Sequence, residues 1–193
     1  ILCQNKKSLV YLINHNTVTI HRWLSKYTDP TSPDTMVIDI DPPKGKFHVA
    51  CKGAIFLRER AKELGYKAFV MLTGAKGLHV VFPVIKKVSF EDIRIILGNV
   101  ILDIERAYPN EFTSNIKKEK RDDHVYLDIL RNSYGQTAVA PYSVKAEKEA
   151  SIAMPIDWDE LEDPLLHSKK YNILNIFSTL DKRKTDPWEY FYK

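Results

Sequence analysis

The stretch MVIDIDPPKG, residues 36–45, has the pattern of an apolar strand that is followed by two prolines. Pro42 and Pro43 mark the end of the strand, since proline cannot donate a hydrogen bond to a β-ladder. Successive side chains of a strand alternate between the two faces of a sheet. Asp39 and Asp41 are therefore predicted to share one face, while the isoleucine before each of them faces the core.

The segments on either side of this strand mix helical and strand patterns. Further strands are expected at residues 17–23, 67–72, 78–84, 124–130 and 136–140. Helices are expected at residues 49–64 and 90–104, with Ser89 as N-cap of the second, a helical or buried segment at 8–14, a loop at 28–34 and a short terminal helix at 157–161. The order lacks regular βαβ alternation, which predicts an α+β fold.

The overall composition is that of one globular domain. With 193 residues, of which 44% are hydrophobic, the chain can bury one sizeable core. Its two cysteines, Cys3 and Cys51, form no metal motif and no disulfide framework, which is typical of a reducing cytoplasm. No apolar run approaches the roughly 20 residues of a membrane span. We therefore expect a cytoplasmic protein without a membrane partner, and the net charge of +4 permits a nucleic-acid partner without demanding one.

A second acidic strand is expected at residues 124–130. There Asp128 shares a face with His124 and Tyr126. If this strand neighbours the first, Asp128 joins Asp39 and Asp41 in one cluster. Carboxylates are the ligands that hard divalent cations such as Mg²⁺ or Mn²⁺ take, and two such ions can promote phosphoryl transfer. The alternative for the Asp-x-Asp pair alone is an edge strand with a polar outer face.

The turn TGAKGLH, residues 73–79, is a candidate phosphate site. Its glycines allow close approach of the backbone, and Thr73, Lys76 and His79 offer a hydroxyl and two potentially cationic groups for a triphosphate. It is not a Walker motif, because the spacing and the following helix are missing. An ordinary hairpin turn with a surface lysine is the alternative.

Two further basic residues are candidates of a weaker kind. Lys145 lies in the segment APYSVKA, residues 140–146, where it shares a face with Ser143 if the backbone is extended. His21 lies in the strand expected at residues 17–23, and a lone histidine in a strand is more often structural than functional.

The blocks IDIDPP, TGAKGLH, YLDILRN and TAVAPYSVKA follow one another in an order that resembles the polymerase domain of bacterial ligase D. That domain is a member of the archaeo-eukaryotic primase superfamily and serves in non-homologous end joining. The resemblance extends from residues 17–25 to residues 186–188. It implies one primase-like catalytic domain over residues 1–193, with a mixed or antiparallel sheet flanked by helices. Family members carry an additional N-terminal portion that contacts the template and the 5′-phosphate of the broken end, and we expect this chain to lack it.

The resemblance also implies roles for individual residues. Asp39, Asp41 and Asp128 match the catalytic carboxylates, which hold divalent ions, usually manganese. The residues that match the family's nucleotide site or lie close to it are His21, Thr73, Lys76, His79, Asn132 and Lys145. Thr73 stands where the family usually has serine. Lys145 stands where it commonly has arginine, so the charge is kept but the planar bidentate fork is lost.

The function implied by the resemblance is template-directed nucleotidyl transfer that fills or extends DNA ends. The implied cofactor is Mn²⁺ or Mg²⁺, the substrates are NTP or dNTP and a primer-template, and the implied protein partners are Ku and a DNA ligase. One alternative is a primase-like core that binds nucleotides or DNA ends without turnover. Another is a D-x-D glycosyltransferase, against which the third carboxylate and the TGAKGLH turn argue.

Overall fold

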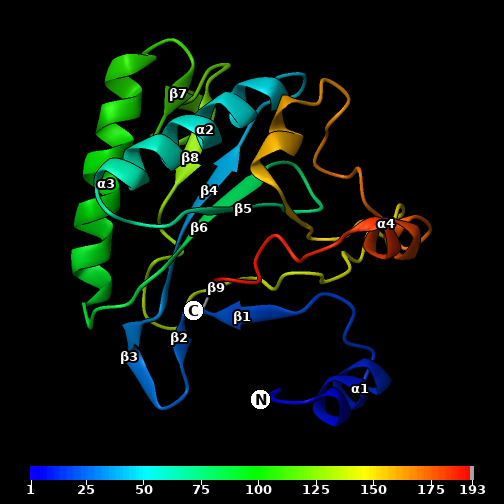
Figure 1. Cartoon of the computed structure of the whole chain (residues 1–193). Coiled ribbons are helices and arrows are strands. Elements are labelled where there is room, and N and C mark those ends of the chain that lie inside the picture. The colour runs from blue at the N-terminus through cyan, green and yellow to red at the C-terminus, as the bar shows by residue number, and fades with distance from the viewer. Residues whose placement is uncertain (192–193) are drawn as a thin grey trace.

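A six-stranded sheet forms the centre of the computed structural model, which describes residues 1–191 (Figure 1). The strands, in their spatial order, are β10 (Pro155–Ile156), β5 (Phe69–Leu72), β6 (Leu78–Pro83), β4 (Thr35–Asp41), β8 (Val125–Asp128) and β7 (Phe112–Thr113). Neighbouring strands are antiparallel except for β7 and β8, which run parallel, so the sheet is mixed, in agreement with what the family resemblance implies.

Two long helices cover one face of the sheet. The first, α2 (Phe47–Glu63), contacts β4, β6 and the second helix, α3 (Phe90–Ala107) (Figure 1). The capping residues predicted for α3 are confirmed, since the Ser89 hydroxyl accepts from the Asp92 N–H while the Asp92 carboxylate accepts from the Ser89 N–H. Both helices therefore form where the periodicity predicts them, and α2 begins two residues earlier than expected.

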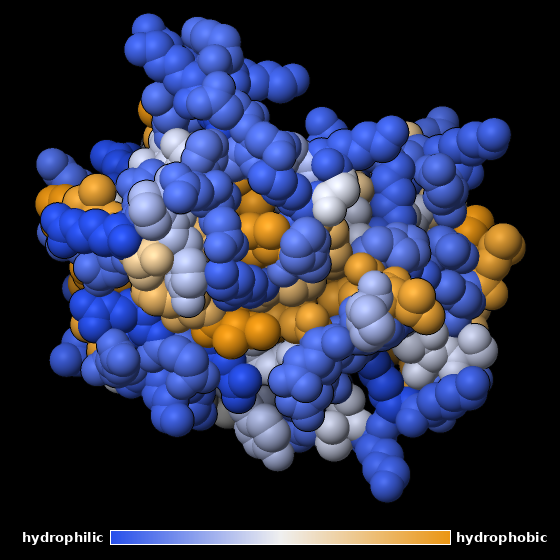
Figure 2. All heavy atoms as spheres, turned by 90° about the horizontal axis from the view of Figure 1, so that it is seen from above, coloured by the Kyte–Doolittle hydropathy of each residue, from blue (hydrophilic) through white to orange (hydrophobic). Residues whose placement is uncertain are grey.

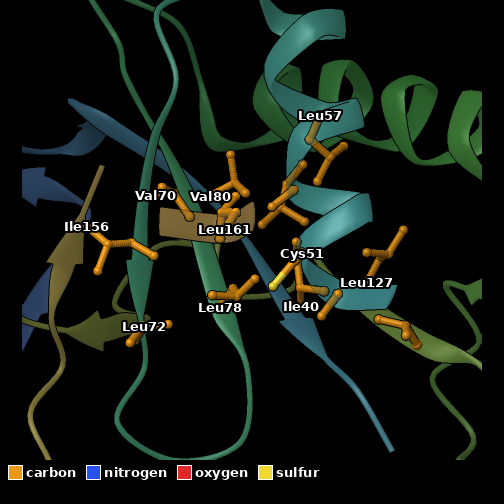
Figure 3. Close-up of a cluster of buried hydrophobic side chains, with 14 of the residues drawn as sticks. Ile40, Cys51, Leu57, Val70, Leu72, Leu78, Val80, Leu127, Ile156 and Leu161 are labelled. Atoms are coloured by element: carbon orange, nitrogen blue, oxygen red, sulfur yellow. The ribbon is translucent and has the colours of Figure 1, made fainter. Parts of the chain in front are cut away.

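The main hydrophobic core lies between these helices and the sheet. Ile40 of β4, Leu57 of α2 and Val80 of β6 are fully buried there and lie in one layer with Cys51 (Figure 3). Complete burial of one aliphatic side chain is worth about 1.5–3 kcal/mol. This face of β4 is thus specified by packing alone.

The other face of the sheet is covered only in part. A two-stranded sheet of β1 (His21–Trp23) and β9 (Thr137–Val139) lies away from α2 and α3 (Figure 1). Val37 of β4 packs in a second cluster with Leu24 and Ala138, and the C-terminal residues Trp188 and Phe191 belong to the same cluster. The acidic end of β4 lies beyond this cluster and carries the candidate site.

The peripheral elements differ most from the prediction. Residues 28–34, predicted as a loop, contain β3 (Asp29–Pro33), which pairs with β2 (Ser25–Lys26). Only three residues of the strand expected at 17–23 form β1. The remaining elements are α1 (Lys6–Asn14), the 3₁₀ turns η1 (Lys118–Lys120) and η2 (Trp158–Glu162), and α4 (Ile176–Lys182).

The surface is mainly hydrophilic on the face that Figure 2 shows, where hydrophobic side chains are visible in a central hollow and at the edges. Helix α1 lies apart from the sheet in Figure 1 and buries none of its residues. Within residues 1–191, no helix is both long and apolar enough to cross a membrane.

Candidate active site

The acidic residues of β4 lie in the middle of the sheet, between β6 and β8, which excludes the edge-strand alternative. The register places Asp39 directly opposite Asp128 of β8 on one side and opposite His79 of β6 on the other. Directly opposed residues of an antiparallel pair have Cβ atoms about 4.5–5.5 Å apart. Three strands therefore bring these three side chains together.

Asp39 is buried and paired with the guanidinium of Arg131, and His79 lies beside it. Its Oδ2 accepts a hydrogen bond from Nε of Arg131 at 2.8 Å, and Nε2 of His79 lies 3.4 Å from the same oxygen. Burial by itself would raise the pKa of Asp39, but His79 and Arg131 outweigh it and lower the pKa to about 2. The carboxylate is therefore held in its ionised form.

Asp41 and Asp128 have different surroundings. Burial, reinforced by the negative charge of Asp39, raises the pKa of Asp41. Asp128 accepts a hydrogen bond from the backbone N–H of Leu130 at 2.7 Å. Opposite Asp41 lies Tyr126, whose ring carries the guanidinium of Arg121 at 3.4 Å from its centroid.

The strand register brings the three carboxylates to one place in the middle of the sheet. Among residues 1–191, no three Asp, Glu, His or Cys side chains are grouped so that they could hold a metal ion. Arg131 already donates a hydrogen bond to one oxygen of Asp39, Oδ2. The donors themselves, three carboxylates on the adjacent strands β4 and β8, are of the kind that a hard divalent cation takes.

The turn between β5 and β6 is tight and rests on β4. Thr73 closes it, because its hydroxyl donates to the carbonyl of Gly77 and accepts from the N–H groups of Ala75 and Gly77. A Cβ on Gly77 would lie 1.8 Å from the carbonyl oxygen of Ile40, so only glycine allows this approach. Thr73 thus shapes the turn, and Lys76 is exposed at its tip.

Most of the predicted site residues line one pocket of about 260 Å³. They are Asp39, Asp41, His21, Thr73, Lys76, His79 and Lys145, and Arg131 joins them. Burial and then the positive charge of Lys145 lower the pKa of His21. The pocket therefore combines acidic side chains from β4 with basic groups from the turn, from β1 and from the segment after β9.

Asn132 directly follows Arg131 in the chain, and its side chain contacts the backbone. Its side chain is fully buried, where its oxygen accepts from the Val37 N–H at 2.9 Å and its amide group donates to the carbonyls of Val37 and Ile129. All these partners are backbone groups. Asn132 therefore ties the end of β8 to β4 and is not among the residues that line the pocket.

A larger cavity of about 790 Å³ adjoins the pocket, and Asp41 and Lys76 line both. Its other basic lining residues are Lys44, Lys118, Arg121, His124 and His167. Two of them, Lys118 and Arg121, belong to the basic stretch IKKEKR, residues 116–121, to which the sequence alone assigns no role. The acidic end of β4 thus lies where a small pocket and a large basic cavity meet.

Arg131 is the site residue that sequence reasoning missed. It follows Asp128 by three residues in the block YLDILRN, so its position near the acidic strand is readable from the sequence. Its hydrogen bond to Asp39 cannot be read from the sequence, because the two residues are 92 positions apart in the chain.

The comparisons with known proteins point to one family. The family model of the LigD primase-polymerase domain matches residues 1–188. The chain is 26% identical over 190 residues to the multifunctional non-homologous end joining protein LigD of Pseudomonas aeruginosa, covering 96% of this chain and 22% of that protein. It is 30% identical over 145 residues to the multifunctional non-homologous end joining DNA repair protein LigD of Mycobacterium tuberculosis, covering 75% of this chain and 19% of that protein.

The structural comparison agrees. The polymerase domain of Mycobacterium tuberculosis ligase D, in a complex with DNA, superposes with a TM-score of 0.84 at 25% sequence identity, covering 95% of this chain and 66% of that chain. The chain spans 22% of the length of the Pseudomonas aeruginosa relative and 19% of the Mycobacterium tuberculosis one. The predicted resemblance and the α+β, primase-like fold class are confirmed.

Proposed function

We propose a function from the premise that this chain belongs to the LigD primase-polymerase domain family. The protein is a nucleotidyltransferase that adds nucleotides to a DNA end during repair by non-homologous end joining. One observation carries this proposal. A pocket with acidic residues on β4 and basic residues at its rim opens at Asp41 onto a larger basic cavity.

The acidic end of β4 supports metal-dependent chemistry. We assign Asp39, Asp41 and Asp128 as the residues that would hold Mn²⁺ or Mg²⁺. Such an ion, when bound, supplies a positive charge that activates the attacking hydroxyl and stabilises the charge of the transferred phosphoryl group. The reaction forms a bond between the primer 3′-oxygen and the nucleotide α-phosphorus and releases pyrophosphate.

The basic rim supports the binding of a triphosphate. Lys76 and Lys145 line the pocket from two different segments, and His21 and Arg131 belong to the same lining. Lysine contacts phosphate as a compact point charge, without the fork of arginine. These residues hold the triphosphate in line with the acidic end of β4, so that its α-phosphate meets the primer there.

The primer-template is proposed to bind in the larger cavity. A basic surface attracts the phosphate backbone of nucleic acids irrespective of sequence. A strand that lies along Lys118 and Arg121 reaches Asp41, where the two cavities meet. The superposed relative was solved in a complex with DNA. Ku and a DNA ligase stay predictions from the family resemblance.

The experiment that tests this proposal is primer extension with Mn²⁺ on gapped, 5′-phosphorylated DNA, comparing dNTPs with NTPs. Extension by the wild-type protein and its loss in Asp41→Asn are the expected results. Tight nucleotide binding without extension favours instead a core that binds without turnover, the second candidate. Transfer of a sugar from a sugar nucleotide, without extension, contradicts both.

A further inference from the structure

Arg131 is a positively charged side chain placed where the proposed metal site needs a free carboxylate. We propose that Arg131 is the resident counter-ion of this site, and that a divalent cation must displace it from Asp39 in order to bind. The inference rests on the proposed function and deepens it, since it names a residue of this chain that controls access to the acidic cluster.

The geometry shows a surface residue reaching a buried partner. Nε of Arg131 donates to Oδ2 of Asp39 at 2.8 Å, and its Nη1 donates to the carbonyl of Thr137 in β9 at 3.3 Å. The side chain of Arg131 is 38% exposed, whereas that of Asp39 is 5% exposed. The guanidinium is therefore the member of the pair that can leave.

Charge balance explains why the pair forms. A buried carboxylate without a partner is strongly unfavourable, so Asp39 needs a cation in the sheet interior. The nearest nitrogen of His79 lies 3.4 Å from Oδ2, farther than Nε of Arg131. Arg131 therefore supplies the closer of the two compensating contacts.

A divalent cation and Arg131 compete for the negative charge of one carboxylate, Asp39. A cation bound to Asp39 lies within a few ångströms of the guanidinium, and two cations at that distance repel each other. When Asp39 takes a metal, its charge is compensated and Arg131 is no longer needed. Binding of metal thus requires, and also permits, the release of Arg131.

The released side chain has a defined place to go. Arg131 lines the same pocket as Lys145 and His21, the residues assigned to the triphosphate. A guanidinium can hold two phosphate oxygens at once. When the phosphates of a nucleotide bind the Arg131 guanidinium, Asp39 becomes free for the metal, and the affinity for the metal rises. Because such coupling is reciprocal, bound metal raises the affinity for the nucleotide by the same factor.

The test measures Mn²⁺ binding to the full chain without nucleotide, by isothermal titration calorimetry and by the electron paramagnetic resonance signal of free Mn²⁺. Arg131→Gln should bind Mn²⁺ about tenfold more tightly than the wild type, since one charge-assisted hydrogen bond no longer opposes the metal. Arg94→Gln is the matched control, because Arg94 donates to Ser133 Oγ at 2.7 Å and to the carbonyl of Asn132 instead of to a carboxylate. It removes the same charge and should leave Mn²⁺ affinity unchanged.

A second measurement keeps the test decisive if Arg131→Gln does not fold. In the wild-type protein, the Nε–Hε nuclear magnetic resonance signal of Arg131 should shift when Mg²⁺ saturates the site. The inference is overturned, even where primer extension succeeds, by either of two results. One is an unchanged or weaker Mn²⁺ affinity in folded Arg131→Gln, and the other is an unchanged chemical shift of the Nε–Hε signal at saturating Mg²⁺. If none of the proteins binds a divalent ion, the metal chemistry of the proposed function fails and the inference fails with it.

Discussion

The two faces of β4 differ in what holds their side chains in place. On the helix-covered face, Ile38 and Ile40 are fully buried and need only neighbours of suitable volume. On the open face, Asp39 is also buried, but it depends on Arg131 and His79 for charge compensation. A hydrophobic face requires only side chains that fill the available volume. A buried acidic side chain requires a particular oppositely charged or hydrogen-bonding partner. Changes on the two faces should therefore have different consequences.

The largest expected effect is on the open face. Asp41→Asn should lower the rate of primer extension by more than about a hundredfold. Replacing a residue that only orients a metal ligand can already cost up to about a hundredfold, so the loss of a ligand should cost more. The fold should persist, because burial raises the pKa of Asp41 and a neutral side chain relieves that cost. The measurements are extension kinetics and a thermal melt. Extension at the wild-type rate contradicts the assignment of Asp41.

The matching change on the helix-covered face is Leu57→Ala. Leu57 is fully buried on α2, and truncation of such a side chain lowers the free energy of unfolding by about 2–5 kcal/mol. Urea denaturation measures the loss. The folded variant should keep the wild-type kcat at a temperature below its transition. A lower kcat in the fully folded variant would show that packing on the helix-covered face also affects the activity.

The two carboxylates of the open face should differ in their pH dependence without metal, measured in EDTA. The pKa of Asp39 falls from 3.8 to about 2 on folding, so ionised Asp39 contributes about 2 kcal/mol above pH 4, which is lost as the pH falls through 2. Asp39→Asn should lower the free energy of unfolding at pH 7 by about this amount.

Asp41 has the opposite sign. Its pKa is raised in the folded protein, so its ionised form destabilises the fold at neutral pH and protonation stabilises it as the pH falls. Asp41→Asn should therefore maintain or raise stability at pH 7. Chemical denaturation of both variants across pH checks the contrast, and equal losses for the two would remove it.

The smallest effect concerns the basic rim. Lys145→Ala should raise the nucleotide Kd about tenfold, the loss of one charge-assisted hydrogen bond of about 1.4 kcal/mol. Lys145→Arg, the control, should maintain or tighten binding because arginine adds a bidentate contact. Titration with a labelled nucleotide measures both. An unchanged Kd in Lys145→Ala would show that this lysine is no phosphate ligand.

The sequence predicts the helix-covered face well because the signals are local. The alternation in β4, the capping pair at Ser89 and the β5–β6 turn each depend on residues close in the chain. It fails at β3, where prolines and acidic residues suggested a loop. Pro30 and Pro33 have no N–H to donate to the ladder. Both strands of a two-stranded sheet are edge strands, where proline is tolerated because only some ladder hydrogen bonds are lost.

The open face is predictable in its residue types but not in its contacts. The family resemblance identifies the carboxylates and basic residues, and the fold gathers most of them at one pocket. The hydrogen bond of Arg131 to Asp39 and those of Asn132 to Val37 join positions more than 90 residues apart. Such contacts depend on how strands pair in three dimensions, so no local pattern reveals them.

We propose that the acidic end of β4 and the basic rim form one metal-dependent nucleotide site. The most direct measurement is a crystal structure with Mn²⁺ and a non-hydrolysable nucleotide, with manganese located by anomalous scattering. We predict manganese in contact with Asp39, Asp41 and Asp128, and the triphosphate along Lys76 and Lys145. Manganese bound elsewhere, or a triphosphate that contacts neither lysine, would show that these residues do not form one nucleotide site.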